Sequence, residues 1–270
     1  MESIKRPLLS AITGIGILLF LTTSSVVAEQ LSEGANIYLA ATQPQPGSKE
    51  PEDLEPTPPS PLSFGWDITL ASKYLFQGID YSDGKPVVQP EGIITYKGFS
   101  AILWFSHDLD KKVSNEFDLY LQYSQEMENL SLNAGYAHFN YPHREEWDPS
   151  QEVYTDVSYS TILNPSLSIH YDFDAGKGIY STLGISHGVE TPAGTLSLGS
   201  NLFYQSNYYD QTGIPSIEFN TSIEYSISSF TITPSISYFL TWENGDFTED
   251  GPEGPVPDTW LFSINLAQSF

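Results

Sequence analysis

The chain has no cysteine among its 270 residues, and its Lys and Arg residues number only 10 against 34 Asp and Glu. The lack of cysteine excludes a disulfide-stapled fold and any thiolate metal site. A formal net charge of -24 argues against binding to nucleic acid, which requires basic side chains to neutralise phosphates. It also argues against recruitment by anionic lipid headgroups. Aromatic residues nevertheless reach 14%, which is unlike an acidic disordered protein, since such chains contain few aromatics.

Helical periodicity is also missing from Gly65 onward, and apolar and polar residues alternate instead. In "EFDLYLQYS", Phe117, Leu119 and Leu121 share one face while Asp118 lies on the other. Such alternation is typical of β-strands with one apolar face, and turn residues separate the segments. The pattern predicts twelve strands, at 65–79, 87–96, 98–108, 115–126, 129–141, 151–163, 165–173, 178–190, 194–207, 216–228, 229–241 and 259–270.

The first 28 residues predict a secretory signal peptide. Lys5 and Arg6 form a basic start, residues 8–21 form a short apolar run, and Ala28 ends a small-residue cleavage site. An uncleaved membrane anchor is the alternative, although the apolar run is short for a span. Residues 29–63 are rich in proline and acidic residues, so we expect a disordered periplasmic linker. A tether that binds peptidoglycan or a partner is the alternative for this segment.

Short and long connections alternate along the rest of the chain. The connection at Lys97-Gly98 is tight, whereas those at 109–114 and 142–150 are longer and polar. Barrels in the outer membrane of Gram-negative bacteria have this asymmetry, with tight periplasmic turns and long external loops. We therefore predict an all-β fold, a single antiparallel up-and-down transmembrane β-barrel of about 12 strands, over residues 64–270.

A soluble barrel or β-sandwich would show the same alternation but would bury its apolar face. Three features favour contact with lipid. The strands are long for a sandwich, the polar face carries little lysine, and aromatic residues cluster toward strand ends as in interfacial girdles. Tyr74 and Phe76 of the first strand are assigned to such a girdle, together with Tyr141.

The first hairpin resembles that of a known family. Residues 72–79, "SKYLFQGI", are followed by Ser82, Pro86 and Gln89. This run is similar to the opening hairpin of the TorF-type porins, bacterial outer-membrane proteins that typically carry an arginine where this chain has Gln77. The resemblance covers the barrel, with the hairpin as its specific motif, and it implies barrel architecture and outer-membrane location more than a substrate.

The polar strand faces predict an acidic pore. Acidic rings in a pore attract cations and repel anions, so we expect passive diffusion of small hydrophilic solutes with a preference for cations and without a cofactor. A closed structural or interaction barrel that presents acidic extracellular loops is the alternative. Inward Tyr120, Tyr154, Tyr180 and Phe203 would narrow the passage. The candidate pore-lining residues are Lys73, Gln77, Glu91, Asp118, Tyr120, Asp156, His170, Asp172, Glu218 and Glu224.

Catalytic and metal-binding motifs are weak. Residues 184–188 match G-x-S-x-G, but they lie inside a predicted strand, where adjacent Ser186 and His187 point to opposite faces. The acidic segments 143–150 and 243–258 are expected to be solvated loops, and the latter lacks the ligand spacing of a calcium loop. We therefore predict that the protein is not an enzyme and holds no metal.

The final strand ends in an apolar pattern that stops on an aromatic residue. It resembles the C-terminal assembly signal of outer-membrane barrels, which implies recognition by the barrel-assembly machinery. The expected partners are then outer-membrane lipid and lipopolysaccharide, that machinery and small solutes, with no nucleic acid. The residues assigned to the assembly signal are Phe262, Ile264, Leu266 and Phe270.

Overall fold

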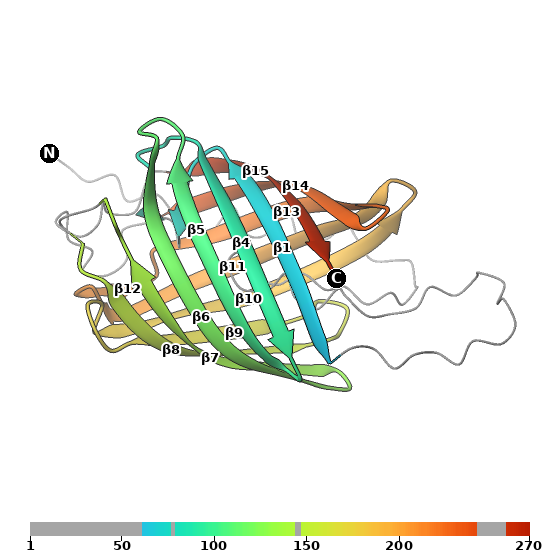
Figure 1. Ribbon diagram of the computed structural model, residues 1–270, viewed down its shortest axis with the longest axis horizontal. Coiled ribbons are helices and arrows are strands. Elements are labelled where there is room, and N and C mark those ends of the chain that lie inside the picture. The colour runs from blue at the N-terminus through green and yellow to red at the C-terminus, as the bar shows by residue number, and fades with distance from the viewer. Residues whose placement is uncertain (1–60, 77–78, 144–146, 242–257) are drawn as a thin grey trace, which may run out of the picture.

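The computed structural model describes residues 61–76, 79–143, 147–241 and 258–270. Within these ranges the chain forms one closed antiparallel barrel of twelve strands, as predicted (Figure 1). No helix in the same ranges has the length and apolar character to cross a membrane. The barrel strands are β1 (Leu62–Ala71), β4 (Val87–Tyr96), β5 (Phe99–Asp108), β6 (Val113–Met127), β7 (Leu130–Asn140), β8 (Ser150–Tyr159), β9 (Ser166–Asp172), β10 (Gly178–Thr191), β11 (Gly194–Tyr208), β13 (Ser216–Ile227), β14 (Phe230–Thr241) and β15 (Thr259–Ser269).

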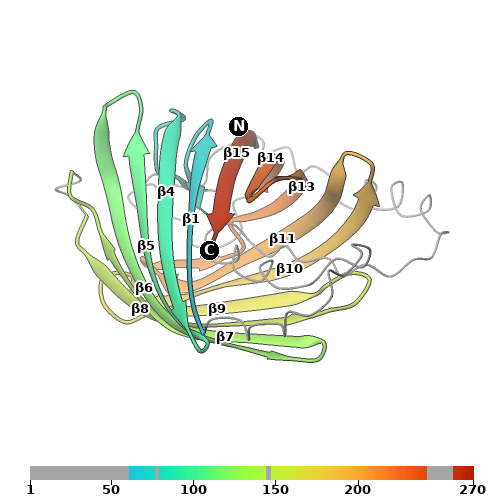
Figure 2. The same ribbon diagram turned by 45° about the vertical axis from the view of Figure 1, so that its right-hand side comes forward.

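The barrel closes where the first and last strands meet. β1 pairs with β15 on one side and with β4 on the other, so that Ile68 lies opposite both Leu266 and Pro90. Beyond the end of β15, the Phe270 amide donates to the Phe64 carbonyl at 2.8 Å. Each of these twelve strands therefore has two neighbouring strands, so the barrel wall formed by them has no edge strand. Figure 2 shows the strands wrapping around a common interior.

The apolar face of the strands lies on the outside. On β1, Ile68 and Leu70 are exposed, while Asp67 and Ala71, on the alternate register, are buried. The other strands repeat this arrangement, with exposed Leu103 and Phe105 on β5 among many others. An apolar outer wall around a polar interior is the reverse of a soluble barrel and is the arrangement of outer-membrane barrels.

Two predicted strands end later than the strands that the structure shows. The strand predicted at 151–163 ends at Tyr159, because residues 160–165 form a turn. In that turn the Asn164 side chain accepts a hydrogen bond from the Thr161 amide at 3.0 Å, and Asn164 itself has a positive φ of 35°. Asparagine tolerates this conformation and its amide mimics a backbone turn, which explains the early end of the strand.

The strand predicted at 65–79 ends at Ala71, and this is the larger correction. After it the chain turns inward and forms a short hairpin of β2 (Leu75–Phe76) and β3 (Ile79–Asp80), which leads back to β4. Tyr74 and Phe76 therefore do not belong to a girdle on the outside. The Asp80 carboxylate holds the return, because it accepts hydrogen bonds from the amides of Ser82 at 2.9 Å and Gly84 at 2.7 Å.

The short connections, such as Lys97-Gly98, lie at one end of the barrel, which is called the turn end here. These turns depend on residues with a positive φ, and Gly194 is the most constrained of them. Its φ is 133°, and an added Cβ would lie 2.0 Å from the Glu224 carbonyl oxygen. We expect Gly194→Ala to lower the free energy of unfolding by about 1–3 kcal/mol through backbone strain, measured by urea titration of the folded barrel. Gly92→Ala is the control, because a Cβ there meets nothing within 4 Å. Equal urea midpoints for the two variants would contradict this expectation.

Candidate functional site in the barrel interior

Acidic side chains from many strands gather inside the barrel. Among the candidate pore residues, Glu91, Asp118, Asp172 and Glu218 are buried on the inward register. Tyr120, Asp156, His170 and Glu224 share the inward registers of their strands and are partly exposed, as is Lys73 in the segment that follows β1. Gln77 lies outside the described residues. Further inward acids that the candidate set omitted are Asp67, Glu116 and Glu152.

Basic partners contribute little to this interior. Lys73 is directed to a hydroxyl, since its Nζ donates to Thr259 Oγ1 at 2.8 Å. The ion pairs between described interior residues involve His170, whose Nδ1 lies 2.6 Å from Glu152 Oε1 and whose Nε2 lies 3.8 Å from Asp156 Oδ1. Acidic side chains therefore outnumber basic ones among the described residues of the interior.

Three buried carboxylates, those of Asp118, Glu152 and Glu218, each have one oxygen that accepts no hydrogen bond from the described residues. Asp118 Oδ2 accepts from the Tyr120 hydroxyl at 3.0 Å. Asp118 Oδ1, Glu152 Oε2 and Glu218 Oε1, in contrast, accept no hydrogen bond from any described residue. Burying a carboxylate oxygen without a partner is unfavourable. These atoms are therefore suited to interact with a positive charge or with water inside the barrel.

Aromatic stacking and hydrogen bonds hold the His170 side chain in the interior. Its ring is stacked between Tyr154 and Tyr180, with ring centroids 5.0 Å and 4.4 Å away and interplanar angles of 14° on both sides. The Tyr180 hydroxyl lies 2.9 Å from Nδ1, and Ser168 Oγ lies 2.9 Å from Nε2. Pairing of β8, β9 and β10 places these rings in one row, and this combination holds the imidazole beside Glu152.

A hydrogen-bond network continues from His170 toward β6. The Ser168 hydroxyl donates to Asp156, which also accepts from Asn133 at 2.9 Å. Asn133 and Tyr154 both donate to Gln122 Oε1, at 3.2 Å and 2.8 Å. Strands β6 to β9 are thus joined by side chains as well as by their backbone ladder. The sequence places these residues on inward faces, but it does not give the strand register that brings them into contact.

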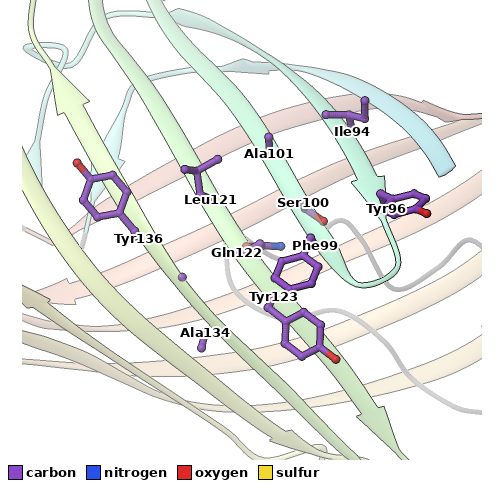
Figure 3. A pocket seen from close by; sticks show the side chains of 11 residues that line it. Ile94, Tyr96, Phe99, Ser100, Ala101, Leu121, Gln122, Tyr123, Ala134 and Tyr136 are labelled. Carbon is purple, nitrogen blue, oxygen red and sulfur yellow. The ribbon is translucent and has the colours of Figure 1, made fainter. Parts of the chain in front are cut away.

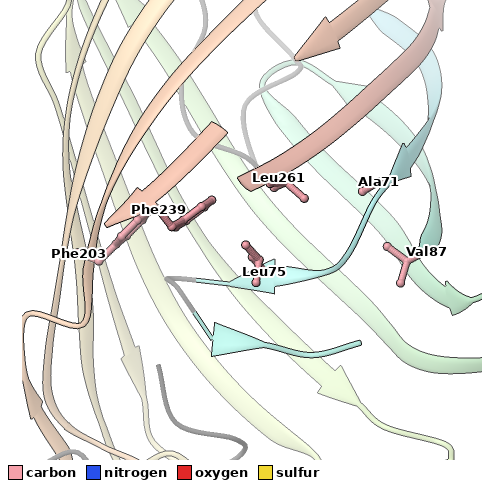
Figure 4. Close-up of a cluster of buried hydrophobic side chains, with 6 residues drawn as sticks. All are labelled: Ala71, Leu75, Val87, Phe203, Phe239 and Leu261. Atoms are coloured by element: carbon pink, nitrogen blue, oxygen red, sulfur yellow. The ribbon is translucent and has the colours of Figure 1, made fainter. Parts of the chain in front are cut away.

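The longer connections between strands lie at the end of the barrel opposite the tight turns, which is called the loop end here. The hairpin β2–β3 occupies the interior at this loop end. Figure 4 shows Leu75 between Ala71 and Val87 on one side and Phe203 and Phe239 on the other. Leu261 of β15 completes this buried apolar cluster. The cluster joins the hairpin to β1, β4, β11, β14 and β15, so the hairpin packs against a large part of the barrel wall.

Aromatic contacts extend the hairpin across the interior. Tyr74 contacts Trp104 of β5, with ring centroids 5.6 Å apart. Phe76 meets Tyr180 edge-on at 5.3 Å, although β10 lies on the opposite side of the barrel from β1 in the strand order. Tyr81 packs on Trp147 of the connection between β7 and β8, at 5.0 Å. The hairpin therefore narrows the loop end and makes it more apolar than the acidic part of the interior.

The catalytic candidates do not come together. Ser186 and His187 point to opposite faces of β10, and the His187 ring lies on the outside, 2.7 Å from the Ile162 carbonyl. In the connection after β7, His143 Nδ1 lies 2.7 Å from the Ser114 carbonyl. The acidic segment 243–257 lies outside the described residues, as do residues 144–146 of the other acidic loop.

Comparison with known proteins places the chain in a family. Residues 55–212 match the model of a family described as bacterial proteins of unknown function, Gcw_chp. The chain belongs to this family. The Gcw_chp match includes β1, the inward hairpin and the strands through β11, so the hairpin is part of the matched region. No curated protein matches the chain.

Solved structures resemble this member of Gcw_chp in fold. A NanC porin is 10% identical, with a TM-score of 0.50, over 75% of this chain and 98% of its own. An outer membrane channel from Pseudomonas putida F1 is 13% identical, with a TM-score of 0.46, over 83% of this chain and 100% of its own. At such low identity the first likeness concerns the fold alone, and it agrees with a barrel of the outer-membrane type.

Proposed function

We propose that the protein is a narrow channel of the bacterial outer membrane that allows passive diffusion of small hydrophilic solutes and prefers cations. The observation that carries the proposal is the acidic interior. Asp118, Glu152 and other inward acids line it, and the interior ion pairs between described residues involve a single histidine, His170. Fixed negative charges in a confined passage attract cations and repel anions.

The location in the outer membrane is part of the same proposal. The wall is apolar outside, and a closed barrel leaves no backbone group unpaired in lipid. The signal peptide predicted at 1–28 and the linker predicted at 29–63, whose last two residues belong to β1, would agree with export to the periplasm. The assembly signal at Phe262, Ile264, Leu266 and Phe270 and the TorF-type resemblance belong to this proposal as well. The proposal also includes the expected partners, which are lipid, lipopolysaccharide and the barrel-assembly machinery. It includes the absence of enzymatic activity as well.

Planar-bilayer recording of the refolded full chain in a salt gradient tests the selectivity. We expect single-channel steps whose reversal potential has the sign of cation permeation, because the inward carboxylates outnumber the cations near them. Polyanionic solutes should pass more slowly than cations of similar size. A reversal potential of the opposite sign would refute cation preference, and it would leave the channel itself standing.

A closed barrel that serves as a structural or interaction protein is the second candidate. The hairpin favours it, since Leu75 is buried among five strands and Phe76 reaches Tyr180 across the interior. Conductance separates the two candidates. Folded protein that inserts into bilayers and never conducts, even after the hairpin contacts are removed, would support the closed barrel.

A further inference from the structure

The outer wall of the barrel has a hollow of about 650 Å³ near the tight turns (Figure 3). It extends over β4, β5, β6 and β7, and its volume is within the range of small-ligand sites. Its rim is made of large apolar and aromatic side chains that are exposed on the outside of the barrel. The outward residues around it are Ile94, Tyr96, Phe99, Ala101, Leu121, Tyr123, Ala134 and Tyr136.

Two alanines create the hollow. Ala101 lies beside Leu121 in one cross-strand row, and Ala134 lies beside Tyr123 in the next row toward the turns. Each alanine leaves a gap where its neighbours carry a long side chain. Because the two gaps lie in successive rows on β5 and β7, they join into one apolar hollow that is longer than a single missing side chain.

A basic residue lies at the turn end of this hollow. Lys97 has its Nζ 5.3 Å from the centre of the Tyr96 ring, and Tyr96 lines the hollow. The other described lysines, Lys73, Lys85, Lys111, Lys112 and Lys177, all lie in connections at the loop end of the barrel. Among the described residues, Lys97 is thus the cation at the turn end of a protein with a net charge of -24.

We propose that this hollow binds one glycerophospholipid, with an acyl chain over Ala101 and Ala134 and the phosphate at Lys97. The proposal rests on the membrane location proposed above. Lipid chains and apolar side chains are equally apolar, so a specific site in a membrane depends on close packing and on polar contacts. The hollow provides the packing surface, and Lys97 provides the charge that complements a phosphate.

The position of the hollow along the barrel agrees with this orientation. Tyr96 and Phe99 flank the Lys97-Gly98 turn, and Tyr123 of β6 pairs with Phe99, where the turn end of the barrel would meet the headgroup region. Aromatic residues and lysine are typical of that region, because their polar ends reach water while their apolar parts remain in lipid. An acyl chain that extends from Lys97 over Ala134 to Ala101 would enter the hydrocarbon layer along the wall.

Native mass spectrometry of the full chain tests the site. The folded protein is inserted into phosphatidylglycerol vesicles, extracted in mild detergent and examined for retained lipid. We expect one retained lipid on the wild type and about tenfold lower occupancy on Ala134→Leu, because the leucine fills the hollow. Lys97→Gln should lower occupancy about fivefold through the lost charge.

Two control variants make the same kinds of substitution at positions away from the hollow. Thr221→Leu adds apolar bulk to the lipid-facing register of β13, away from the hollow. Lys177→Gln removes a lysine that also has a positive φ, 46° against 50° for Lys97, but at the loop end. Both controls should retain lipid as the wild type does. Equal occupancy in Ala134→Leu and Thr221→Leu would overturn the proposal, as would a dimer that forms through the hollow instead of a lipid complex.

Vesicle flotation separates this proposal from the one on which it rests. Protein that floats with vesicles and resists protease, yet retains no lipid, would refute the lipid site and leave the membrane location intact. Protein that folds but does not float would refute the membrane location itself.

Discussion

Replacing Leu75, Phe76 and Tyr81 by alanine is expected to raise single-channel conductance by roughly fivefold, because the barrel is wide enough to pass ions once its interior is cleared. These three side chains anchor the hairpin to opposite parts of the wall. Leu75 lies in the buried cluster with Phe203 and Phe239, and Phe76 contacts Tyr180. Without these contacts the hairpin loses its fixed position, and the loop end of the interior opens.

The twelve barrel strands should survive this change, since their backbone ladder does not include β2 and β3. Heat-dependent gel mobility checks that the variant is folded before recording. A triple variant of exposed residues, Leu103→Ala, Phe105→Ala and Tyr171→Ala, removes the same kinds of side chain from the outside and should leave conductance unchanged. A folded hairpin variant with wild-type conductance would show that the hairpin does not limit the passage.

Asp118→Asn is expected to make the barrel more stable and less selective at the same time. The carboxylate is buried, and its Oδ1 accepts no hydrogen bond from any described residue. Removing such a charge should raise the free energy of unfolding by about 1–3 kcal/mol, the typical penalty for an unsatisfied buried group. The permeability ratio of cations to anions should fall roughly twofold or more, since a fixed negative charge has left the interior.

Asp210→Asn is the matched control for this prediction. Asp210 is exposed at the turn after β11 and has a φ of 61°, which asparagine also adopts readily. The same change of charge there should affect neither the urea midpoint nor the reversal potential. If Asp118→Asn instead destabilised the barrel, the carboxylate would have to be serving a structural role, and the assignment to the passage would be wrong.

The sequence predicts the barrel well because alternation and connection length are local properties. Twelve strands, their approximate limits and the inward position of Asp118 and His170 all follow from a period of two. The hairpin does not follow, since Tyr74 and Phe76 continue the same alternation whether they face lipid or the barrel interior. The stacking of His170 between Tyr154 and Tyr180 depends on the register of three strands, which no local pattern specifies.

The meeting of the first and last strands has a consequence for how the protein folds. Asn265 of β15 donates to Asp67 of β1 at 2.9 Å across a sequence separation of 198 residues. Contacts this distant form slowly, because a long loop must close before they contribute any stability. Until β15 has joined β1, the chain exposes two open edges that can pair with other chains. We therefore expect the seam between these strands to form late and to be the point where aggregation competes most directly with folding.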